Sequence, residues 1–544
     1  MCAPASGTVT ASGPASPGWH PSGPGGHAGV AETHSGVVFF VGDRAYKLKK
    51  PLDLGFLDYR SREAREAACH REVELNRRLA PDVYLGVADV VGPDGQPFDH
   101  LVVMRRLPAS RRLATLVADG QPVRGDLRRL ARLLAAFHSR AETSRQIEDA
   151  ASRDAVAARW EANAAEMTRF VGPLLDPAVA EEVITLARRY LAGRGSLFAS
   201  RVAAGRARDG HGDLLADDIF CLNDGPRVLD CLEFDDTLRW GDVLADVAFL
   251  AMDLERLGRA DLAGQFLAAY REFAGDTWPD SLAHHHIAYR AQVRAKVAAL
   301  AWEQADEGSR AQDRAAREAQ HLLSLAAEHL RAGRVALVVI GGLPGTGKST
   351  LAGYLGEALG AAVLRSDEIR KQLAGIDPAV PAPAPFGQGL YRPEMTEATY
   401  GELLRRAQAL LAAGRSVVAD ASWHDPAWRE AARTLAGQVS ADLAEVRCEL
   451  PIELIVERVG ARTAAGSDAS DATTTLVRRL AASQQPWPSA LAVDATPPPA
   501  QVAENVLRSL AAAGTAAARP ADHGMSRAPA PASQGARGAR ESVP

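Results

Sequence analysis

The residues best suited to chemistry form a glycine-rich segment in the second half of the chain. Residues 342–349 read GLPGTGKS and match the pattern G-x-x-x-x-G-K-[ST] in full. The segment follows an apolar run, 335–340, and precedes a predicted helix, 348–359. Such a loop turns its backbone N–H groups toward phosphates at a helix N-terminus. We therefore expect an ATP and Mg²⁺ site, with Lys348 on the β/γ-phosphates and Ser349 on the metal. The contributing residues are Gly342, Gly345, Thr346, Gly347, Lys348, Ser349 and Thr350.

Two acidic residues extend this predicted site. Asp367 comes just after the predicted strand 362–364, where an acceptor hydroxyl would lie. Asp420 ends the apolar strand 416–419, the usual place for a carboxylate in the metal shell. Two structural alternatives stay open: Asp367 caps the helix that follows it, or Asp420 is a turn residue.

A second group of acids occurs in the first half of the chain. Asp213 follows His-Gly in a loop, Asp218 comes five residues later, and Asp230 ends a short apolar run. Phosphoryl transfer uses one carboxylate to orient the attacking hydroxyl and two groups to hold Mg²⁺ across the phosphates. Upstream, Lys47 lies on a predicted strand and Glu72 on the next helix, which is the spacing of a phosphate-binding lysine held by a glutamate.

The second half of the chain resembles the zeta-toxin and polynucleotide-kinase-like group of P-loop kinases. The resemblance covers about 335–490 and rests on the segments 366–370, 417–421, 457–462 and 470–472. It implies that Asp367 is the general base and that Arg458 and Arg462 are lid arginines that stabilise the transferring phosphoryl group. Arg370 would contact acceptor or phosphate. The alternative is that these arginines lie on a surface helix and are simply solvated. The group phosphorylates many kinds of acceptor, so the resemblance does not identify the acceptor of this chain.

The first half resembles the aminoglycoside-phosphotransferase branch of the protein-kinase-like fold, over about 33–305. It is similar to a subfamily fused ahead of a zeta-toxin-like kinase, with the strand Tyr-Lys-x-Lys-Lys-Pro at 46–51. The resemblance implies that Asp213 is the catalytic base, Asp230 the principal Mg²⁺ ligand and Lys47 the phosphate-binding lysine. Lys49 shares a strand face with Lys47 and is the alternative to it.

Two departures separate this half from the superfamily. Asp218 stands where most members have asparagine as the second metal ligand, and it adds a charge. The loop G-x-G-x-x-G is missing, so that only residues 33–36 are placed to cover the phosphates. The alternative is a pseudokinase that keeps the fold and binds nucleotide without turnover.

A basic segment lies on the helix where the resemblance places acceptors. Arg290 and Arg294 are four residues apart and share a helix face, and Lys296 follows. The face either recognises a phosphorylated or acidic acceptor or is simply solvated. It argues against the polycationic aminoglycosides as acceptors. The adjacent histidines 284–286 point in different directions, and we expect them at the surface or at an interface.

The elements that position these residues predict a multidomain chain. A small sheet-containing lobe precedes a larger helical lobe, which is an α+β two-lobed kinase-like fold. The second half alternates strand and helix, which is typical of an α/β P-loop kinase with a parallel doubly wound sheet. The expected segments are a disordered tail (1–30), a kinase-like domain (31–310), a linker helix (311–332), a P-loop kinase domain (333–512) and a disordered tail (513–544).

Composition narrows the classes of protein. The 544 residues are 47% hydrophobic and 24% charged with a net charge of −5, which excludes a fibrous or wholly disordered chain. The balanced charge argues against a nucleic-acid binder. Five cysteines without C-x-x-C spacing indicate reduced thiols in a cytoplasmic protein, and no apolar run is long enough to cross a membrane.

The sequence therefore predicts an ATP-dependent phosphotransferase that uses Mg²⁺ and phosphorylates small-molecule hydroxyl acceptors. Two alternatives stay open. The N-terminal domain is a non-catalytic nucleotide or ligand sensor that regulates the P-loop domain, or the whole chain is an ATP-driven stress or regulatory protein. The acceptors and the oligomeric state do not follow from the sequence.

Overall fold

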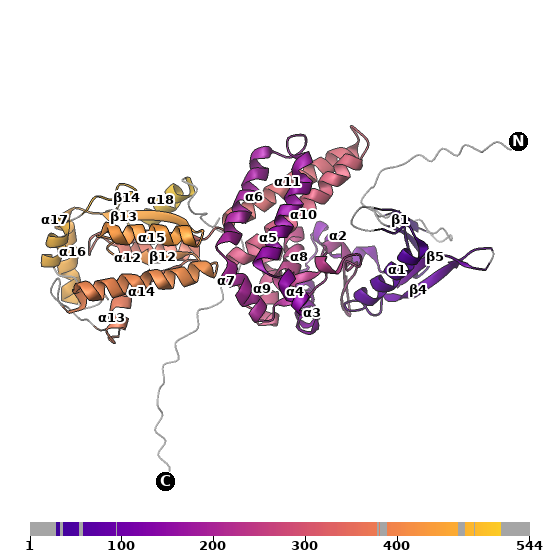
Figure 1. The fold of residues 1–544 in the computed structure, drawn as a ribbon, viewed down its shortest axis with the longest axis horizontal. Coiled ribbons are helices and arrows are strands. Elements are labelled where there is room, and N and C mark those ends of the chain that lie inside the picture. Colours follow the sequence, from indigo (N-terminus) through magenta and orange to yellow (C-terminus); the bar gives the residue numbers. More distant parts are fainter. Residues whose placement is uncertain are drawn as a thin grey trace, which may run out of the picture.

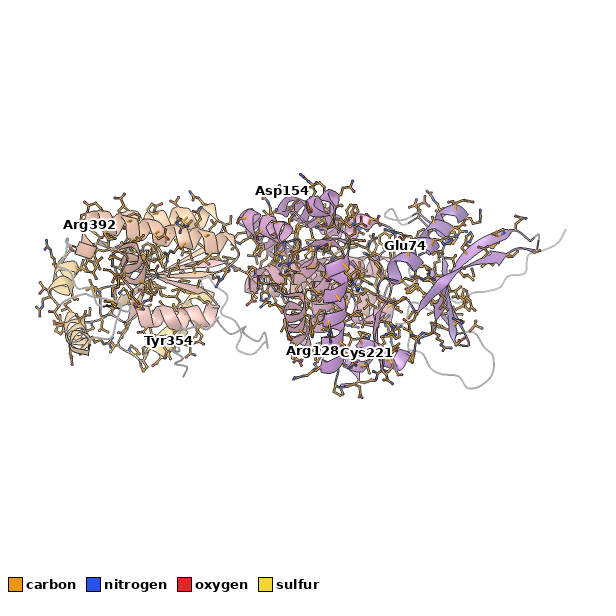
Figure 2. All side chains as sticks on the ribbon, turned by 90° about the horizontal axis from the view of Figure 1, so that it is seen from below. Glu74, Arg128, Asp154, Cys221, Tyr354 and Arg392 are labelled. Atoms are coloured by element: carbon orange, nitrogen blue, oxygen red, sulfur yellow. The ribbon has the colours of Figure 1, made fainter. Side chains whose placement is uncertain are left out.

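The protein is built as a row of three blocks. The computed structural model describes residues 29–512 except 33–35, 54–57, 94, 378–379, 381–388, 466–473 and 484. A small sheet lobe, a helical lobe and an α/β domain follow one another along the long axis (Figure 1). A view from below shows the same order, with Glu74, Asp154 and Tyr354 in successive blocks (Figure 2). The predicted multidomain architecture is confirmed, while most of the two predicted tails lies outside the described residues.

The small lobe is an antiparallel sheet with one helix. Its order is β1-β2-β3-β5-β4, formed by β1 (Gly29–Glu32), β2 (Gly36–Val41), β3 (Arg44–Lys49), β4 (Tyr84–Val91) and β5 (Pro97–Arg105). The tight turn between β2 and β3 uses Gly42 at φ 56°, a conformation that favours glycine. Helix α1 (Arg62–Asn76) begins where the Ser61 side chain accepts from the Ala64 N–H. The alternation of β3 places Lys47 and Lys49 on one face, and both ammonium groups contact Glu72 of α1.

The helical lobe surrounds a helix that is buried on nearly all sides, α8 (Val243–Arg256). Two short two-stranded sheets lie at its edge, β6 (Ala207–Asp209) with β9 (Trp240–Asp242) and β7 (Ile219–Leu222) with β8 (Gly225–Val228). None of the helices in the described ranges is long and apolar enough to cross a membrane. The other helices are α2 (Leu113–Ala118), α3 (Arg124–Arg140), α4 (Arg145–Ala150), α5 (Arg153–Met167), α6 (Pro177–Ala192), α7 (Gly195–Ala203), α9 (Ala260–Ala274), α10 (Asp280–Gln304) and α11 (Arg310–Ala332).

The α/β domain is a fully parallel five-stranded sheet covered on both faces, as predicted. Its order is β11-β12-β10-β13-β14, formed by β10 (Ala336–Gly341), β11 (Ala362–Arg365), β12 (Val417–Asp420), β13 (Asp442–Glu449) and β14 (Leu491–Asp494). Helices α12 (Lys348–Leu359) and α18 (Pro499–Ala512) cover one face, and α14 (Pro393–Ala412) and α15 (Pro426–Gln438) cover the other. Helix α13 (Ser366–Leu373) follows β11 in the chain, and helix α16 (Ile452–Ala465) follows β13. Helix α17 (Thr474–Ala482) comes after α16.

The α/β domain rests on the helical lobe through the amino ends of its strands. Ser281 Oγ donates to Gly414 O just before β12 (2.6 Å), and Arg194 Nη1 donates to Val439 O just before β13 (2.8 Å). Asp442, the first residue of β13, pairs with Arg189 at 2.6 Å. The carboxyl ends of the parallel strands therefore point away from the helical lobe, while the small lobe lies at the other end of the row (Figure 1).

One expectation about the helical lobe is wrong. His285 and His286 are only 1% and 3% exposed, so they are neither surface nor interface residues. Trp160 Nε1 donates to His285 Nε2 at 3.2 Å, and burial holds the pKa of both imidazoles below the usual value. Three successive helix positions do point in different directions, but α10 is covered on enough sides to bury two of them.

Candidate active sites

A glutamate clamps two lysines between the lobes of the N-terminal half. Glu72 is fully buried, with Lys47 Nζ 2.9 Å from Oε1 and Lys49 Nζ 2.7 Å from Oε2. Burial alone would raise the pKa of Glu72, but the two ammonium groups lower it and keep the carboxylate ionised. Lys49 also donates to Glu233 (2.5 Å), which accepts a second hydrogen bond from Tyr59. Lys47 instead donates to Asp230 (2.7 Å). The structure thus separates the two candidates, because Lys47 alone bridges Glu72 and Asp230.

Asp230 is held in an unusual backbone conformation. Its φ of 63° lies in the left-handed region, two residues after β8 ends at Val228. The Tyr84 hydroxyl accepts from the Asp230 N–H, and the side chain is half exposed. The Lys47 ammonium keeps the pKa of Asp230 below its usual range. Asp230 is therefore an ionised carboxylate presented at the lobe boundary.

The loop that carries Asp213 is fixed from α8. Asp246, buried in that helix, accepts from the N–H groups of His211 (2.9 Å) and Gly212 (2.8 Å) and contacts His138 Nε2 at 3.0 Å. One turn before the end of α8, Asp253 accepts from the Ala216 N–H at 2.8 Å. The segment 211–216 is therefore tied to α8 at both ends, which orients the side chain of Asp213 between them.

Asp213, Asp218 and Asp230 influence one another's ionisation. Burial, and then the Asp230 carboxylate, raise the pKa of Asp218 well above its usual value, and burial raises the pKa of Asp213 to about 6. Within the described ranges, neither Asp213 nor Asp218 forms an ion pair. No three ligand side chains converge as a metal centre in that part of the chain. Mg²⁺ at a kinase site needs only one or two carboxylates in addition to substrate phosphates, so Asp218 and Asp230 fit this donor set.

The P-loop of the C-terminal half adopts a shape that only glycine fits. It connects β10 to α12, and Gly342, Gly345 and Gly347 have φ values of 138°, 90° and 90°. A Cβ at Gly345 would lie 2.6 Å from Val459 Cγ2. Thr346 is buried, and its hydroxyl donates to Leu343 O at 2.8 Å. Lys348, Ser349 and Thr350 form the first turn of α12, where the helix dipole favours anions.

We expect Gly345→Ala to destabilise the C-terminal domain by roughly 1–3 kcal/mol, because the new Cβ meets Val459 and the backbone is left-handed. The matched control is Gly353→Ala in the exposed interior of α12, where nothing lies within 4 Å of a new Cβ. That change should stabilise the helix by about 0.5–1 kcal/mol. Thermal unfolding with and without ATP measures both. Equal melting temperatures for the two variants would contradict the tight loop.

Asp420 lies beside the P-loop with one unsatisfied oxygen. It is the last residue of β12 and 3% exposed, so it is not a turn residue. Burial raises the pKa of Asp420, while Lys348 and a hydrogen bond with Ser349 act to lower it. Its Oδ1 atom is buried without a hydrogen-bond partner in the described part of the chain. A buried carboxylate oxygen without a partner next to a serine hydroxyl fits the shell of a divalent cation.

Asp367 and the lid candidates lie on helices around this loop. Asp367 is in the first turn of α13 but does not cap it, because no side chain caps that helix. Arg370 Nη1 donates to Asp367 Oδ1 at 2.7 Å, so the predicted base already has a cationic partner. Arg458 of α16 approaches the loop, with Nη1 4.0 Å from a Cβ built on Gly347. Arg462 also lies on α16, and its side chain is outside the described residues, as is the segment 470–472.

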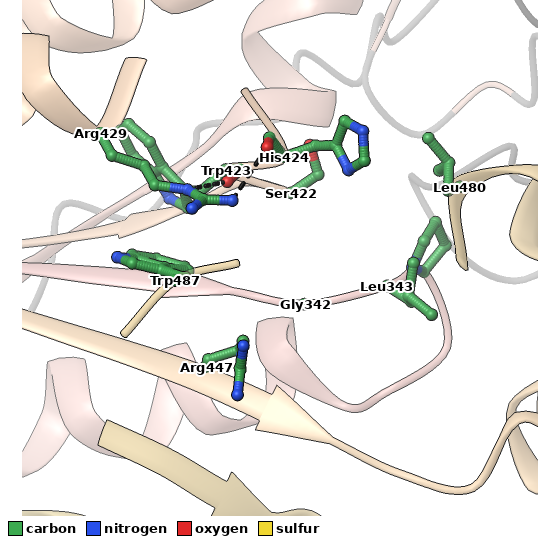
Figure 3. A pocket seen from close by; sticks show the side chains of 10 residues that line it. Gly342, Leu343, Ser422, Trp423, His424, Arg429, Arg447, Leu480 and Trp487 are labelled. Carbon is green, nitrogen blue, oxygen red and sulfur yellow. Dashed lines mark hydrogen bonds between the residues drawn. The ribbon is translucent and has the colours of Figure 1, made fainter. Parts of the chain in front are cut away.

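Sequence reasoning missed several residues that shape these sites. Asp246 orients the Asp213 loop, and its only sequence signal is a carboxylate within the apolar stretch of α8. A pocket beside the P-loop has walls from the ends of β10 and β12 and from the segment before β14 (Figure 3). There the Arg429 guanidinium lies over the Trp487 ring, 4.7 Å from its centre, and Arg429 Nε donates to Trp423 O at 2.6 Å. No motif predicted these contacts, because they join three distant segments.

Comparisons with known proteins agree with the two halves. A model of the phosphotransferase enzyme family matches residues 29–284, and a model of an AAA domain matches residues 337–487. Uncharacterized proteins of Mycobacterium tuberculosis and Mycobacterium bovis are each 43% identical over 469 residues. The alignment covers 86% of this chain and 92% of each relative. The predicted order, a phosphotransferase-like domain followed by a P-loop kinase-like domain, is confirmed.

Solved structures with similarity to each half include two kinases. A gluconokinase from Sinorhizobium meliloti is 21% identical, with 33% of this chain and 93% of that chain covered and a TM-score of 0.25. A choline/ethanolamine kinase family protein from Mesorhizobium loti is 14% identical, with 56% and 92% covered and a TM-score of 0.35. Since both TM-scores are below 0.5, the family models and the mycobacterial relatives carry the assignment.

Proposed function

The chain belongs to the family of the two mycobacterial proteins, and from that premise we propose that it transfers the γ-phosphate of ATP to hydroxyl groups at two separate sites. The acceptors are small molecules, and the C-terminal site is the better supported of the two. The observation that carries the proposal is the arrangement of Lys348, Ser349 and the unpartnered Oδ1 of Asp420 at one sheet edge.

At the C-terminal site, the loop amides and the Lys348 ammonium bind the phosphates of ATP. Ser349 and Asp420 would hold Mg²⁺, which when bound neutralises phosphate charge. Asp367 orients the acceptor hydroxyl and accepts its proton, and Arg370 donates a hydrogen bond to that carboxylate. Arg458, with Arg462 one turn further on α16, stabilises the charge of the transferring phosphoryl group.

At the N-terminal site, Lys47 binds the phosphates and Glu72 orients its ammonium group. Asp218 and Asp230 would hold Mg²⁺, and Lys47, which contacts Asp230 at 2.7 Å, would then be available to a phosphate oxygen. Asp213 accepts the proton of the acceptor hydroxyl. The rigid attachment of its loop to Asp246 and Asp253 supports this role, because a general base must be held within hydrogen-bond reach of the proton.

Transfer of labelled γ-phosphate from ATP to a panel of sugars, amino sugars, nucleosides and peptides tests the proposal. We expect a stable phosphate monoester on at least one acceptor and no transfer by a variant that combines Lys348→Ala with Asp213→Ala. Release of free phosphate alone, with every acceptor unmodified, would contradict phosphotransfer and favour an ATP-driven regulatory protein.

The N-terminal site should lose activity in mild acid. Burial, opposed by Arg294 and reinforced by Asp230, raises the pKa of Asp213 to about 6, so the proton-accepting form predominates only above that pH. In a chain that carries Lys348→Ala, we expect kcat/KM to fall about tenfold per pH unit below about 6. The pH profile of initial rates measures this. A flat profile between pH 5 and 7.5 would show that Asp213 does not act as the base.

One observation favours a second function for the N-terminal half. Position 218 carries a carboxylate in place of the usual amide, and burial together with the nearby Asp230 and Asp213 raises the pKa of Asp218 well above its usual value. A domain that binds nucleotide without turnover tolerates this more readily than a catalyst does. In that case Asp213→Ala leaves all phosphotransfer intact, and nucleotide binding at Lys47 instead regulates the P-loop site.

A further inference from the structure

Three arginines of the helical lobe lie on the neighbouring helices α5 and α10. Arg159 lies on α5, and Arg290 and Arg294 lie one turn apart on α10, which packs against both α5 and α8. Within the described ranges, none of the three forms an ion pair with a carboxylate. By contrast Lys296, on the same helix, pairs with Glu166 at 2.9 Å. The basic segment of α10 therefore contains a lysine that is paired with a glutamate and two arginines that form no ion pair within the described residues.

Arg159 and Arg290 are held in place by backbone carbonyl groups and by one aromatic ring. Arg290 Nε donates to Ala245 O at 3.0 Å, and its guanidinium lies 4.7 Å from the centre of the Phe249 ring. Arg159 donates to Ala150 O (2.8 Å) and Trp240 O (3.3 Å). Burial lowers the pKa of Arg159, with Tyr289 opposing this effect and the positive charge of Arg290 adding to it. Holding like charges together in a half-buried place is costly unless an anion joins them.

The cluster lies along the same stretch of α8 that holds the Asp213 loop. Arg290 contacts Ala245, which is next to Asp246 in the chain, and Phe249, which lies between Asp246 and Asp253. These two acids bind the ends of segment 211–216. Arg294 is one turn further along α10 and has no hydrogen bond or ion pair in the described part of the chain. It lies close enough to Asp213 to lower the pKa of that carboxyl against the effect of burial.

The nearby acids are already engaged. Glu161 is held by Arg188 at 2.7 Å, and Asp253 accepts from Arg256 at 2.7 Å. Neither is free to neutralise the arginines or to recognise a cationic acceptor. Asp230 contacts Lys47 at 2.7 Å, on the side of the site that would bind the phosphates. The acceptor side therefore presents guanidinium groups, whose planar donors match the geometry of phosphate and carboxylate.

We infer that the acceptor of the N-terminal site carries an oxyanion, a phosphate or carboxylate group, which Arg290 and Arg294 bind so that a neighbouring hydroxyl reaches Asp213. This deepens the proposed function and rests on it for the transfer step, though not for the binding of the anion. The reaction moves the γ-phosphoryl group from ATP to the acceptor oxygen, the hydroxyl proton goes to Asp213, and ADP leaves. Cationic acceptors such as amino sugars are disfavoured by charge.

The first experiment measures binding and needs no acceptor. The full chain is saturated with a non-hydrolysable ATP analogue and Mg²⁺, which occupies both phosphate sites, and inorganic phosphate is titrated against melting temperature. We expect saturable stabilisation that Arg294→Gln weakens at least tenfold and that Arg294→Lys partly restores. Arg128→Gln, which removes an exposed arginine paired with Glu272, is the matched control and should bind as the wild type does. Equal binding by wild type and Arg294→Gln, or none by either, overturns the oxyanion site.

The second experiment measures transfer in a Lys348→Ala chain with matched acceptors: glycerol and glycerol 3-phosphate, glucose, glucose 6-phosphate and gluconate, and kanamycin as a cation. We expect transfer only to members with an oxyanion, and Arg294→Gln should raise their KM at least tenfold while KM for ATP stays unchanged. Preferred transfer to kanamycin or to the neutral members overturns the inference. Anion binding without any transfer would retain the site and contradict the proposed function instead.

Discussion

Lys348→Ala should reduce phosphotransfer at the C-terminal site by a factor of at least roughly 10²–10³. Lys348 is the first residue of α12 and 9% exposed, and the charge of its ammonium group acts on Asp420 across the loop. Removing it takes a cation from the position where negative charge develops on the β/γ-phosphates. Arginine should not replace it, because the planar guanidinium does not fit a loop that closely surrounds a compact ammonium.

The measurement is the initial rate of ADP formation with saturating acceptor. Lys371→Ala is the matched control, since Lys371 is a buried lysine of the same domain whose Nζ donates to Val380 O, away from the loop. A folded Lys371→Ala chain should keep its activity. A Lys348→Ala chain with unchanged C-terminal activity would contradict the assignment of the P-loop as the phosphate site.

Asp213→Asn should reduce transfer at the N-terminal site by a factor of roughly 10²–10⁴, the usual contribution of a general base. The amide has the same shape but cannot accept the proton, so binding of nucleotide should persist. The loss should also remove the inflection near pH 6 that the pKa of Asp213 imposes.

Asp217→Asn serves as its control. Asp217 is exposed and lies four residues from Asp213, and within the described residues its one ion pair is with Arg112, at 3.7 Å. Rates in a Lys348→Ala background isolate the N-terminal site for both variants. If Asp213→Asn and Asp217→Asn behave alike, the N-terminal half is a nucleotide-binding regulator and not a catalyst.

The local motifs predicted much of each site. The P-loop was readable because its glycines, lysine and serine are consecutive and lie between an apolar strand and a helix. Lys47 and Glu72 were readable from their order on a strand and a helix, but the choice between Lys47 and Lys49 was not. Both point the same way from β3, and only the position of Asp230, far along the chain, distinguishes them.

Long-range features were not readable in the same way. Asp246 orients the Asp213 loop from a helix 33 residues later, and no short pattern links the two. The histidines at 285 and 286 were expected at the surface or at an interface because three adjacent polar residues do not indicate which helices cover α10. The structure buries both of them. Arg290 and Arg294 were ambiguous for the opposite reason, since a basic helix face looks alike whether solvated or turned toward a site.

The arrangement of the domains limits how the two sites can cooperate. The amino ends of the parallel strands rest on the helical lobe, so the P-loop opens away from it. Lys47 lies on β3 of the small lobe, at the other end of the row of blocks (Figure 1). A product of one site must therefore leave the protein before it reaches the other in the same chain. Communication between the sites would instead pass through contacts such as those of Arg194 and Ser281 with the α/β domain.

The central claim is that one chain contains two independent nucleotide sites. Calorimetric titration of the full chain with a non-hydrolysable ATP analogue and Mg²⁺ tests it most directly. We predict two nucleotides bound per chain, and one in a chain that carries Lys47→Ala, because that change removes the ammonium group that Glu72 and Asp230 position. A single nucleotide per wild-type chain, unaffected by Lys47→Ala, would contradict the account of the N-terminal half as an ATP site.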